Sequence, residues 1–418
     1  MRVHGSGTVT SALLLATMTG TAWAGAVEDY VNLRATELID LQCKALKYVE
    51  HTHVVVARDE ALRNTQESGW LRNGKFDDAQ YQSWFDAREA TALQIAASTG
   101  CTKAAEPYLL FGRGKANELI YRGLVLAFYF DGLPADSLDR APLTDDQKLA
   151  AQRYDGFLQQ IYQANFPAFA DAQRQLAFDA LPATSFNPFS PTGQDGGWDG
   201  LGLDLLGGAL RSDEDYNKFW SARSQASTAV DAVELEVVAE SNGWRLIPES
   251  VDAHTTIPVL TRSDGAAPVR MQLWAGPTTY RLGDDRVLRM VIARQPDGGL
   301  RLMTYGTASA ALSASSTARL FVQNAPHPEG FTSWSYFETA SWRDTPVAFD
   351  GTAVEAACLG GPCFDFPAEA VNAITANPGN DLVELFLAAE PDAVPSPPVD
   401  KATRPGRLSV YSLARLGG

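Results

Sequence analysis

The sequence is poor in the residues and motifs that most often carry catalysis. It contains five histidines and four cysteines among 418 residues. The His-Glu-x-x-His zinc motif is absent, and no Ser-x-x-Lys set occurs. No Gly-x-Ser-x-Gly nucleophile turn occurs beyond the first 24 residues. The sequence alone therefore identifies no catalytic centre.

Positive charge and long apolar runs are also scarce. The chain has 34 Lys and Arg against 50 Asp and Glu, a formal net charge of −16. A protein this acidic repels phosphate groups, which argues against nucleic acid and anionic membrane surfaces as partners. Beyond the N-terminus no apolar run approaches the ~20 residues of a spanning helix, so we expect no membrane span.

The first 24 residues have the organisation of an export signal. Arg2 supplies a positive charge, residues 9–18 form a short apolar core, and Ala22-Trp23-Ala24 is a small-residue cleavage site. We therefore expect residues 1–24 to be removed and the mature protein to be periplasmic or secreted.

Four cysteines in an exported chain predict two disulfides. We favour Cys43–Cys101 and Cys358–Cys363, because each pair then stays inside one predicted domain. Redox-active motifs usually hold two residues between their cysteines. Cys358 and Cys363 are separated by Leu-Gly-Gly-Pro, so we interpret this pair as structural.

The N-terminal part of the chain has helical periodicity. Apolar side chains recur near helical spacing, and capping residues or prolines precede several of the runs. Helices are predicted at residues 27–63 (one helix or two joined ones), 78–98, 107–130 and 145–179, the last with a kink at Pro167. Amphipathic helices with short loops predict an up-down bundle over residues 25–181.

The C-terminal part is expected to be rich in β-structure. One more helix is predicted at 212–227, after which apolar residues alternate with polar ones, as at 234–237. Asn242-Gly243 and Pro296-Asp-Gly-Gly have the composition of hairpin turns. We expect an antiparallel β-sandwich-like domain over 212–418, with a helix at 368–376 and a last strand at 407–413. The predicted fold class is α+β.

A Gly/Pro-rich segment, residues 182–211, separates the two predicted domains as a linker or a ligand-holding loop. It contains Asp195, Asp199 and Asp204, and part of it resembles one copy of a calcium-binding nonapeptide repeat. Carboxylates and exposed carbonyl oxygens are the ligands that calcium prefers. The segment is therefore a possible calcium site, with a solvated linker as the alternative. No other cofactor is expected.

Glu50-His51-Thr52-His53 is the densest group of metal-ligand residue types. On a helix, His51 and His53 would point to different sides, whereas on a strand they would share a face. A transition metal also needs a third ligand, which the sequence does not identify. A metal site at these histidines is the weaker interpretation, and structural histidines are the alternative.

The richest aromatic run lies between residues 331 and 342 and includes Trp334, Tyr336 and Trp342. Trp334 and Tyr336 would share one face of a strand. When exposed, such side chains stack on sugars or on partner side chains, and when buried they form core. We predict these three residues as candidate ligand-binding residues, with a protein or a carbohydrate as partner.

These patterns favour an exported binding or envelope-associated protein without an evident catalytic centre. The alternative is a secreted hydrolase that uses distant carboxylates across the crevice between the domains. The sequence contains nothing that specifies an oligomeric state.

Overall fold

The fold is that of a computed structural model, which describes the larger part of the chain. The described residues are 22–69, 78–137, 139–182, 213–250, 256–265, 268–271, 278–282, 286–307, 309, 312, 317–322, 347–354, 358–376 and 383–388.

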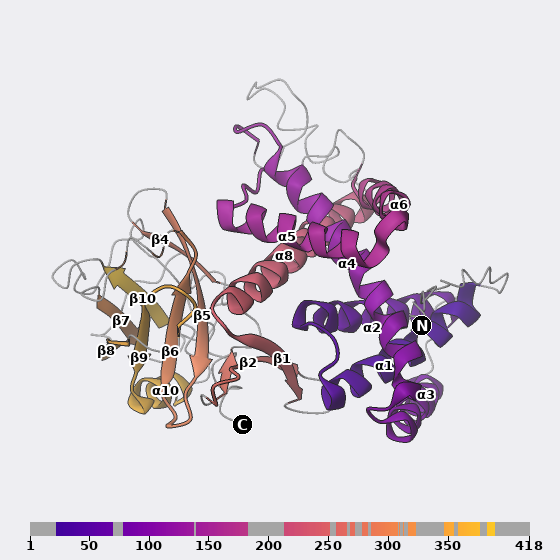
Figure 1. Ribbon diagram of the computed structural model, residues 1–418, viewed down its shortest axis with the longest axis horizontal. Helices are drawn as coiled ribbons and strands as arrows, with labels where there is room; N and C mark the ends of the chain where they lie inside the picture. Colours follow the sequence, from indigo (N-terminus) through magenta and orange to yellow (C-terminus); the bar gives the residue numbers. More distant parts are fainter. Residues whose placement is uncertain are drawn as a thin grey trace, which may run out of the picture.

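The predicted α+β class is confirmed, with the helices mostly before the strands (Figure 1). The helices of the N-terminal bundle are α1 (Ala22–Cys43), α2 (Tyr48–Gly69), α3 (Asp78–Thr99), α4 (Glu106–Asp131), α5 (Asp145–Tyr162) and α6 (Phe166–Asp179). Short 3-10 turns, Lys103–Ala105 and Gln163–Asn165, precede α4 and α6. No helix of the described part is long and apolar enough to cross a membrane.

Local sequence signals set several of these helix boundaries. Thr144 and Gln147 form a capping box at the start of α5, with both reciprocal hydrogen bonds at 3.1 Å. The predicted kink at Pro167 is a break between two helices, because Gln163 has a φ of 48° and Pro167 lies in the first turn of α6. Likewise, the stretch 27–63 forms two helices rather than one.

Helix α8 (Asp213–Ser241) shows that two expectations were wrong. The alternation at 234–237 predicted a strand but lies inside this helix. Polar and apolar residues alternate there because both sides of α8 are buried, against the bundle and against the sheet. Asn242-Gly243 ends the helix instead of forming a hairpin. Gly243 has a φ of 75°, and Trp244 N donates to the Ala239 carbonyl at 2.9 Å.

The strands form one antiparallel sheet. They are β1 (Arg245–Ser250), β2 (Thr256–Thr261), β3 (Val269–Met271), β4 (Thr278–Leu282), β5 (Arg286–Arg294), β6 (Leu300–Tyr305), β7 (Thr317–Val322), β8 (Val347–Val354), β9 (Cys363–Phe366) and β10 (Val383–Ala388). Their order is β1-β2-β3-β5-β6-β9-β8-β7-β10, with β4 paired to β5. The hairpin predicted at Pro296 is confirmed between β5 and β6, where Gly298 has a φ of 90°. The late helix is α10 (Ala368–Thr375).

Strand alternation gives the sheet two buried faces. On one face, Met290 of β5 shares a core with Leu320 of β7 and Val371 of α10. Because β7 is separated from β5 by several strands in the sheet order, the sheet bends over this core in a sandwich-like manner. On the other face, Val291 and Tyr305 share a core with residues of α8 and of β1 to β3.

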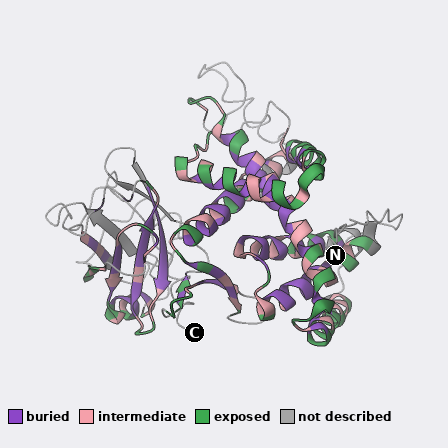
Figure 2. Ribbon diagram, in the orientation of Figure 1, coloured by how far each residue is buried: buried purple, intermediate pink, exposed green. Residues whose placement is uncertain are grey.

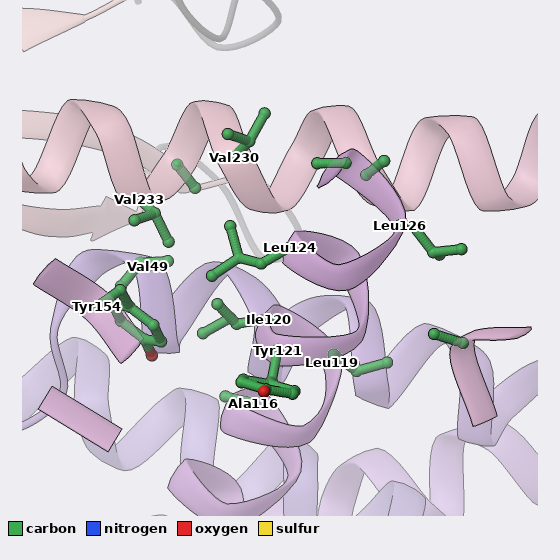
Figure 3. Packing of buried hydrophobic residues seen from close by; sticks show 14 of the residues in the cluster. Val49, Ala116, Leu119, Ile120, Tyr121, Leu124, Leu126, Tyr154, Val230 and Val233 are labelled. Atoms are coloured by element: carbon green, nitrogen blue, oxygen red, sulfur yellow. The ribbon is translucent and has the colours of Figure 1, made fainter. Parts of the chain in front are cut away.

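Helix α8 belongs to the bundle core as well as to the sheet. Val230 and Val233 of α8 join one apolar cluster with Ile120 and Leu124 of α4 (Figure 3). The middle of α8 is accordingly buried along most of its surface (Figure 2). The predicted domain division at 182–211 stays a prediction, but the helix that follows it packs against both halves.

Both predicted disulfides are present. Cys43, at the end of α1, is bonded to Cys101, just after α3, with their Cα atoms 5.4 Å apart. Cys358 is bonded to Cys363 at the start of β9. Each disulfide therefore links segments within one half of the molecule.

Candidate functional site

Polar and charged side chains from four elements meet where the bundle joins the sheet. We call this group the α8 junction and define it as Gln147 of α5, Asp231 and Glu234 of α8, Arg289 of β5 and Tyr305 of β6. Asp231 and Glu234 are three residues apart, which places them on one side of the helix. The register of β5 and β6 places Arg289 directly opposite Tyr305.

One guanidinium holds both carboxylates of the junction. Arg289 Nε donates to Glu234 Oε2 at 2.9 Å, and Arg289 Nη2 lies 2.7 Å from the same oxygen. Arg289 Nη2 also donates to Asp231 Oδ1, which accepts a second hydrogen bond from Gln147 Nε2 at 3.2 Å. Two buried oxygens, Glu234 Oε1 and Tyr305 Oη, make no hydrogen bond to any described residue. The other polar groups described here have hydrogen-bond partners within the junction, and these two oxygens do not.

Burial dominates the electrostatics of the junction. The Glu234 side chain is 0% exposed and the Arg289 side chain 6%. Burial raises the pKa of Glu234 to about 7, although the positive charge of Arg289 opposes the shift. Burial also raises the pKa of Tyr305 well above its ordinary value, so its hydroxyl stays protonated. Glu234 can therefore gain or lose a proton near neutral pH.

A second buried glutamate of α8 faces the bundle. Glu236 Oε2 accepts a hydrogen bond from the backbone N–H of Val49 on α2 at 3.2 Å. Burial raises the pKa of Glu236 to about 7, while the nearby Lys47 ammonium lowers it. Side chains two residues apart on a helix point to different sides. Glu234 therefore faces the sheet, whereas Glu236 faces the bundle.

His51 and His53 both lie on α2 and are both buried, with different partners. His51 Nδ1 is 2.7 Å from Asp40 Oδ2, whereas His53 Nδ1 is 2.8 Å from the Val49 carbonyl oxygen. Burial lowers the pKa of His53 to about 4, so its ring is neutral at neutral pH. No group of three metal-ligating side chains occurs among the described residues. A metal at these histidines has no third ligand in that part of the chain.

Asp40 links His51 to the turn between α1 and α2. Its Oδ1 atom accepts hydrogen bonds from the backbone N–H groups of Ala45 at 2.8 Å and Leu46 at 2.7 Å. The side chains of Asp40 and His51 are 0% and 1% exposed. This arrangement orders the turn and pairs His51 with Asp40.

A further buried polar network ties together α1, α2 and α3. Arg34 of α1 lies between Glu37, 2.9 Å away, and Glu89 of α3, 3.0 Å away. Arg58 of α2 donates to Glu37, and the Tyr30 hydroxyl donates to Glu89. The only sequence signal for this network is a set of charged residues on predicted apolar helix faces.

The α8 junction could not be predicted while the alternation around Glu234 was interpreted as a strand. A signal was nevertheless present. Glu234 follows Val230 and Val233 at helical spacing, and Arg289 interrupts the apolar run of β5. A lone acid and a lone base in two apolar faces indicate a buried pair.

The other predicted site residues lie outside the described part of the chain. These are Asp195, Asp199 and Asp204 for calcium, and Trp334, Tyr336 and Trp342 for ligand binding. Both sites stay predictions.

A small group of aromatic side chains is exposed at one end of the bundle. Tyr129 of α4 and Phe178 of α6 lie in edge-to-face contact, with their ring centroids 6.3 Å apart. Their exposed fractions are 40% and 50%, and the neighbouring Phe128 is 40% exposed. Tyr121, earlier on α4, contacts Phe169, earlier on α6, so the two helices run parallel and end together. We call Phe128, Tyr129 and Phe178 the α4/α6 aromatic surface.

No protein-family model, curated protein or solved structure matches the chain.

Proposed function

We propose that the chain is an exported binding protein that docks a partner polypeptide on the α4/α6 aromatic surface. The observation that carries this proposal is the exposure of Tyr129 and Phe178, which two separate helices hold in contact with each other. Aromatic side chains are enriched at protein interfaces, where they supply contact area at little entropic cost.

Charge indicates the kind of partner. The chain has a formal net charge of −16, and the exposed Asp179 directly follows Phe178. The parallel helices α4 and α6 also present their C-terminal, partially negative ends together. We therefore infer a partner segment that carries apolar anchors among lysine or arginine side chains. A second copy of this acidic chain fits the surface less well.

Export is supported by the signal-like N-terminus and by the two disulfides, which persist in oxidising compartments. The non-catalytic role is supported by the inward pairing of the buried ionisable groups. In particular, Glu234 pairs with Arg289 and His51 pairs with Asp40, and both pairs are buried.

The test uses the mature chain with its disulfides intact and a short amphipathic helical peptide of leucine and lysine. Fluorescence anisotropy measures binding by the wild type, by the double variant Tyr129→Ala/Phe178→Ala, and by Leu110→Ala. Leu110 is a matched control because it is also on α4 and is 55% exposed. We expect at least tenfold weaker binding for the double variant only, since truncated interface anchors typically cost more than about 1.4 kcal/mol.

Two outcomes would overturn the proposal. If the wild type and the double variant bind the peptide equally well, the aromatic surface is not part of the binding site. A dimer in sedimentation that the double variant dissociates would identify a second copy as the occupant. A peptide with glutamate in place of lysine should bind much more weakly, which checks the role of charge.

A secreted hydrolase is the second candidate. The observation that favours it is the meeting of Asp146, Asp231 and Glu234 between bundle and sheet, with a pKa of about 7 at Glu234 that suits a general acid. A screen with chromogenic glycosides and esters tests this candidate. Turnover that Glu234→Gln abolishes would support it, and an inactive wild-type protein would count against it.

A further inference from the structure

We propose that α8 is a proton-controlled joint between the bundle and the sheet, clamped when Glu234 and Glu236 are protonated and loosened when both ionise. This device goes beyond the proposed docking function, and none of its residues belongs to the α4/α6 aromatic surface.

The position of α8 makes it suited to this role. The helix packs against α4, α5 and α2 on one side, and against β1 and the face of β5 and β6 on the other. Glu234 is buried towards the sheet through Arg289, and Glu236 is buried towards the bundle through Val49. Each layer thus contacts one of the two glutamates.

On the sheet side, the acids outnumber the bases when Glu234 is ionised. Arg289 serves both Asp231 and Glu234, so the ionised cluster has one negative charge in excess. Asp146 of α5 adds negative charge nearby, and its Oδ2 atom accepts hydrogen bonds from the N–H and hydroxyl of Thr307. Tyr305 is buried and neutral. A proton on Glu234 removes the excess charge.

On the bundle side, the same imbalance occurs around Glu236. Lys47 is the nearby cation, and it already pairs with Glu240 at 2.6 Å. Glu50 also faces Glu236, but its own cation, Arg113, lies 3.0 Å away and bonds to it. The neighbouring Tyr154 is buried and Tyr48 is partly buried, and desolvation raises the pKa of each hydroxyl. Among the described residues, the cations near Glu236 are already paired, so a proton neutralises Glu236 without breaking another pair.

The direction of the effect follows from the pKa values. Both glutamates have a folded-state pKa of about 7 against an ordinary value of 4.5. Their contribution to the packing of α8 is therefore fully present below about pH 4.5 and is lost as the pH rises through 7. Few other described contacts join the halves directly. They include Arg245 Nη2 to the Lys44 carbonyl at 2.6 Å, Lys44 Nζ to the Pro248 carbonyl, and the Asp146–Thr307 bonds.

Hydrogen exchange followed by mass spectrometry tests the joint in the mature, disulfide-intact chain at pH 6 and pH 8. After correction for the intrinsic exchange rate, peptides from α8, β5 and β6 report local opening. We expect the opening constant in the wild type to rise about tenfold for each glutamate between the two pH values. The increase should disappear in Glu234→Gln/Glu236→Gln.

Asp171→Asn is the control, because it removes one carboxylate charge at an α6 side chain that is 76% exposed and pairs with Arg174. It should keep the wild-type pH dependence. If the double variant does not fold, the single variants replace it. In each of them, the logarithm of the opening constant should change between pH 6 and pH 8 by about half as much as in the wild type. An opening constant that is equal at pH 6 and pH 8 in the wild type, or unchanged pH dependence in the glutamine variants, would overturn the proposal.

Discussion

Gly123 of α4 lies so close to Ala229 of α8 that a Cβ atom at Gly123 would be 2.4 Å from the Ala229 Cβ. The same atom would be 2.7 Å from the Gln225 carbonyl oxygen. No side chain fits at such a distance, so glycine allows the two helices to cross in close contact. This crossing joins α8 to the bundle core.

Replacement of Gly123 by alanine should therefore destabilise the protein. We expect a loss of about 1–3 kcal/mol in the free energy of unfolding, because the added methyl group must push backbone aside. The control is Gly114→Ala, also within α4, where a Cβ would meet nothing within 4 Å. That change should be neutral or stabilising, since alanine favours helix. Urea unfolding followed by circular dichroism measures both variants, and equal stability would contradict the close crossing.

The Asp40 carboxylate should be the most sensitive single group at the turn between α1 and α2. Asp40→Ala removes an acceptor shared by His51 and two backbone N–H groups, all of them at least partly buried. We expect a loss of about 3–5 kcal/mol, as for other broken buried polar pairs. Asp59→Ala, at a side chain that is 51% exposed, should change the stability little. Thermal melting distinguishes the two, and similar melting temperatures would argue against this role for Asp40.

Arg289→Met should destabilise the protein more at pH 8 than at pH 5.5. Without the guanidinium, Asp231 and Glu234 lose their shared cation, and ionised Glu234 becomes costlier. Because the folded-state pKa of Glu234 is raised already, the loss grows as the pH rises through 7. Adding Glu234→Gln should rescue stability at pH 8. A double-mutant cycle measured by urea unfolding tests the coupling, and additive effects would show that the two residues act independently.

A bundle fragment should need α8 in order to fold. The sequence predicts that residues 25–181 fold alone, but α8 supplies Phe219, Val230 and Val233 to the bundle core. We therefore expect residues 25–243 to give a cooperative thermal transition and residues 25–181 to give a weak one or none. The two fragments keep the same Cys43–Cys101 disulfide, which makes them a matched pair. If the two fragments unfold with equal cooperativity, the bundle ends at residue 181, as the sequence predicts.

Local sequence signals predicted much of the bundle. Thr144 marked the start of α5, and Pro107 marked the start of α4. Cysteine positions sufficed for both disulfides, because each half of the chain contains only two cysteines. The interpretation of 234–237 as a strand was wrong, since a helix buried on two sides loses the one-sided apolar pattern on which periodicity depends.

The sequence by itself therefore determined the α+β class, the early helices, the β5–β6 hairpin and the cysteine pairs. The class, the helices and the hairpin depend on composition or on residues that are near each other in the chain, whereas the cysteine pairs follow from the presence of only two cysteines in each half. Only the tertiary structure decided that Arg289 serves Asp231 and Glu234, and that Glu236 faces the opposite layer. Such pairs join residues more than 50 positions apart, and no local spacing records which buried acid meets which buried base. The physical reason is that a lone charge in an apolar run indicates that a partner exists, whereas the packing of α8 between two cores selects the partner.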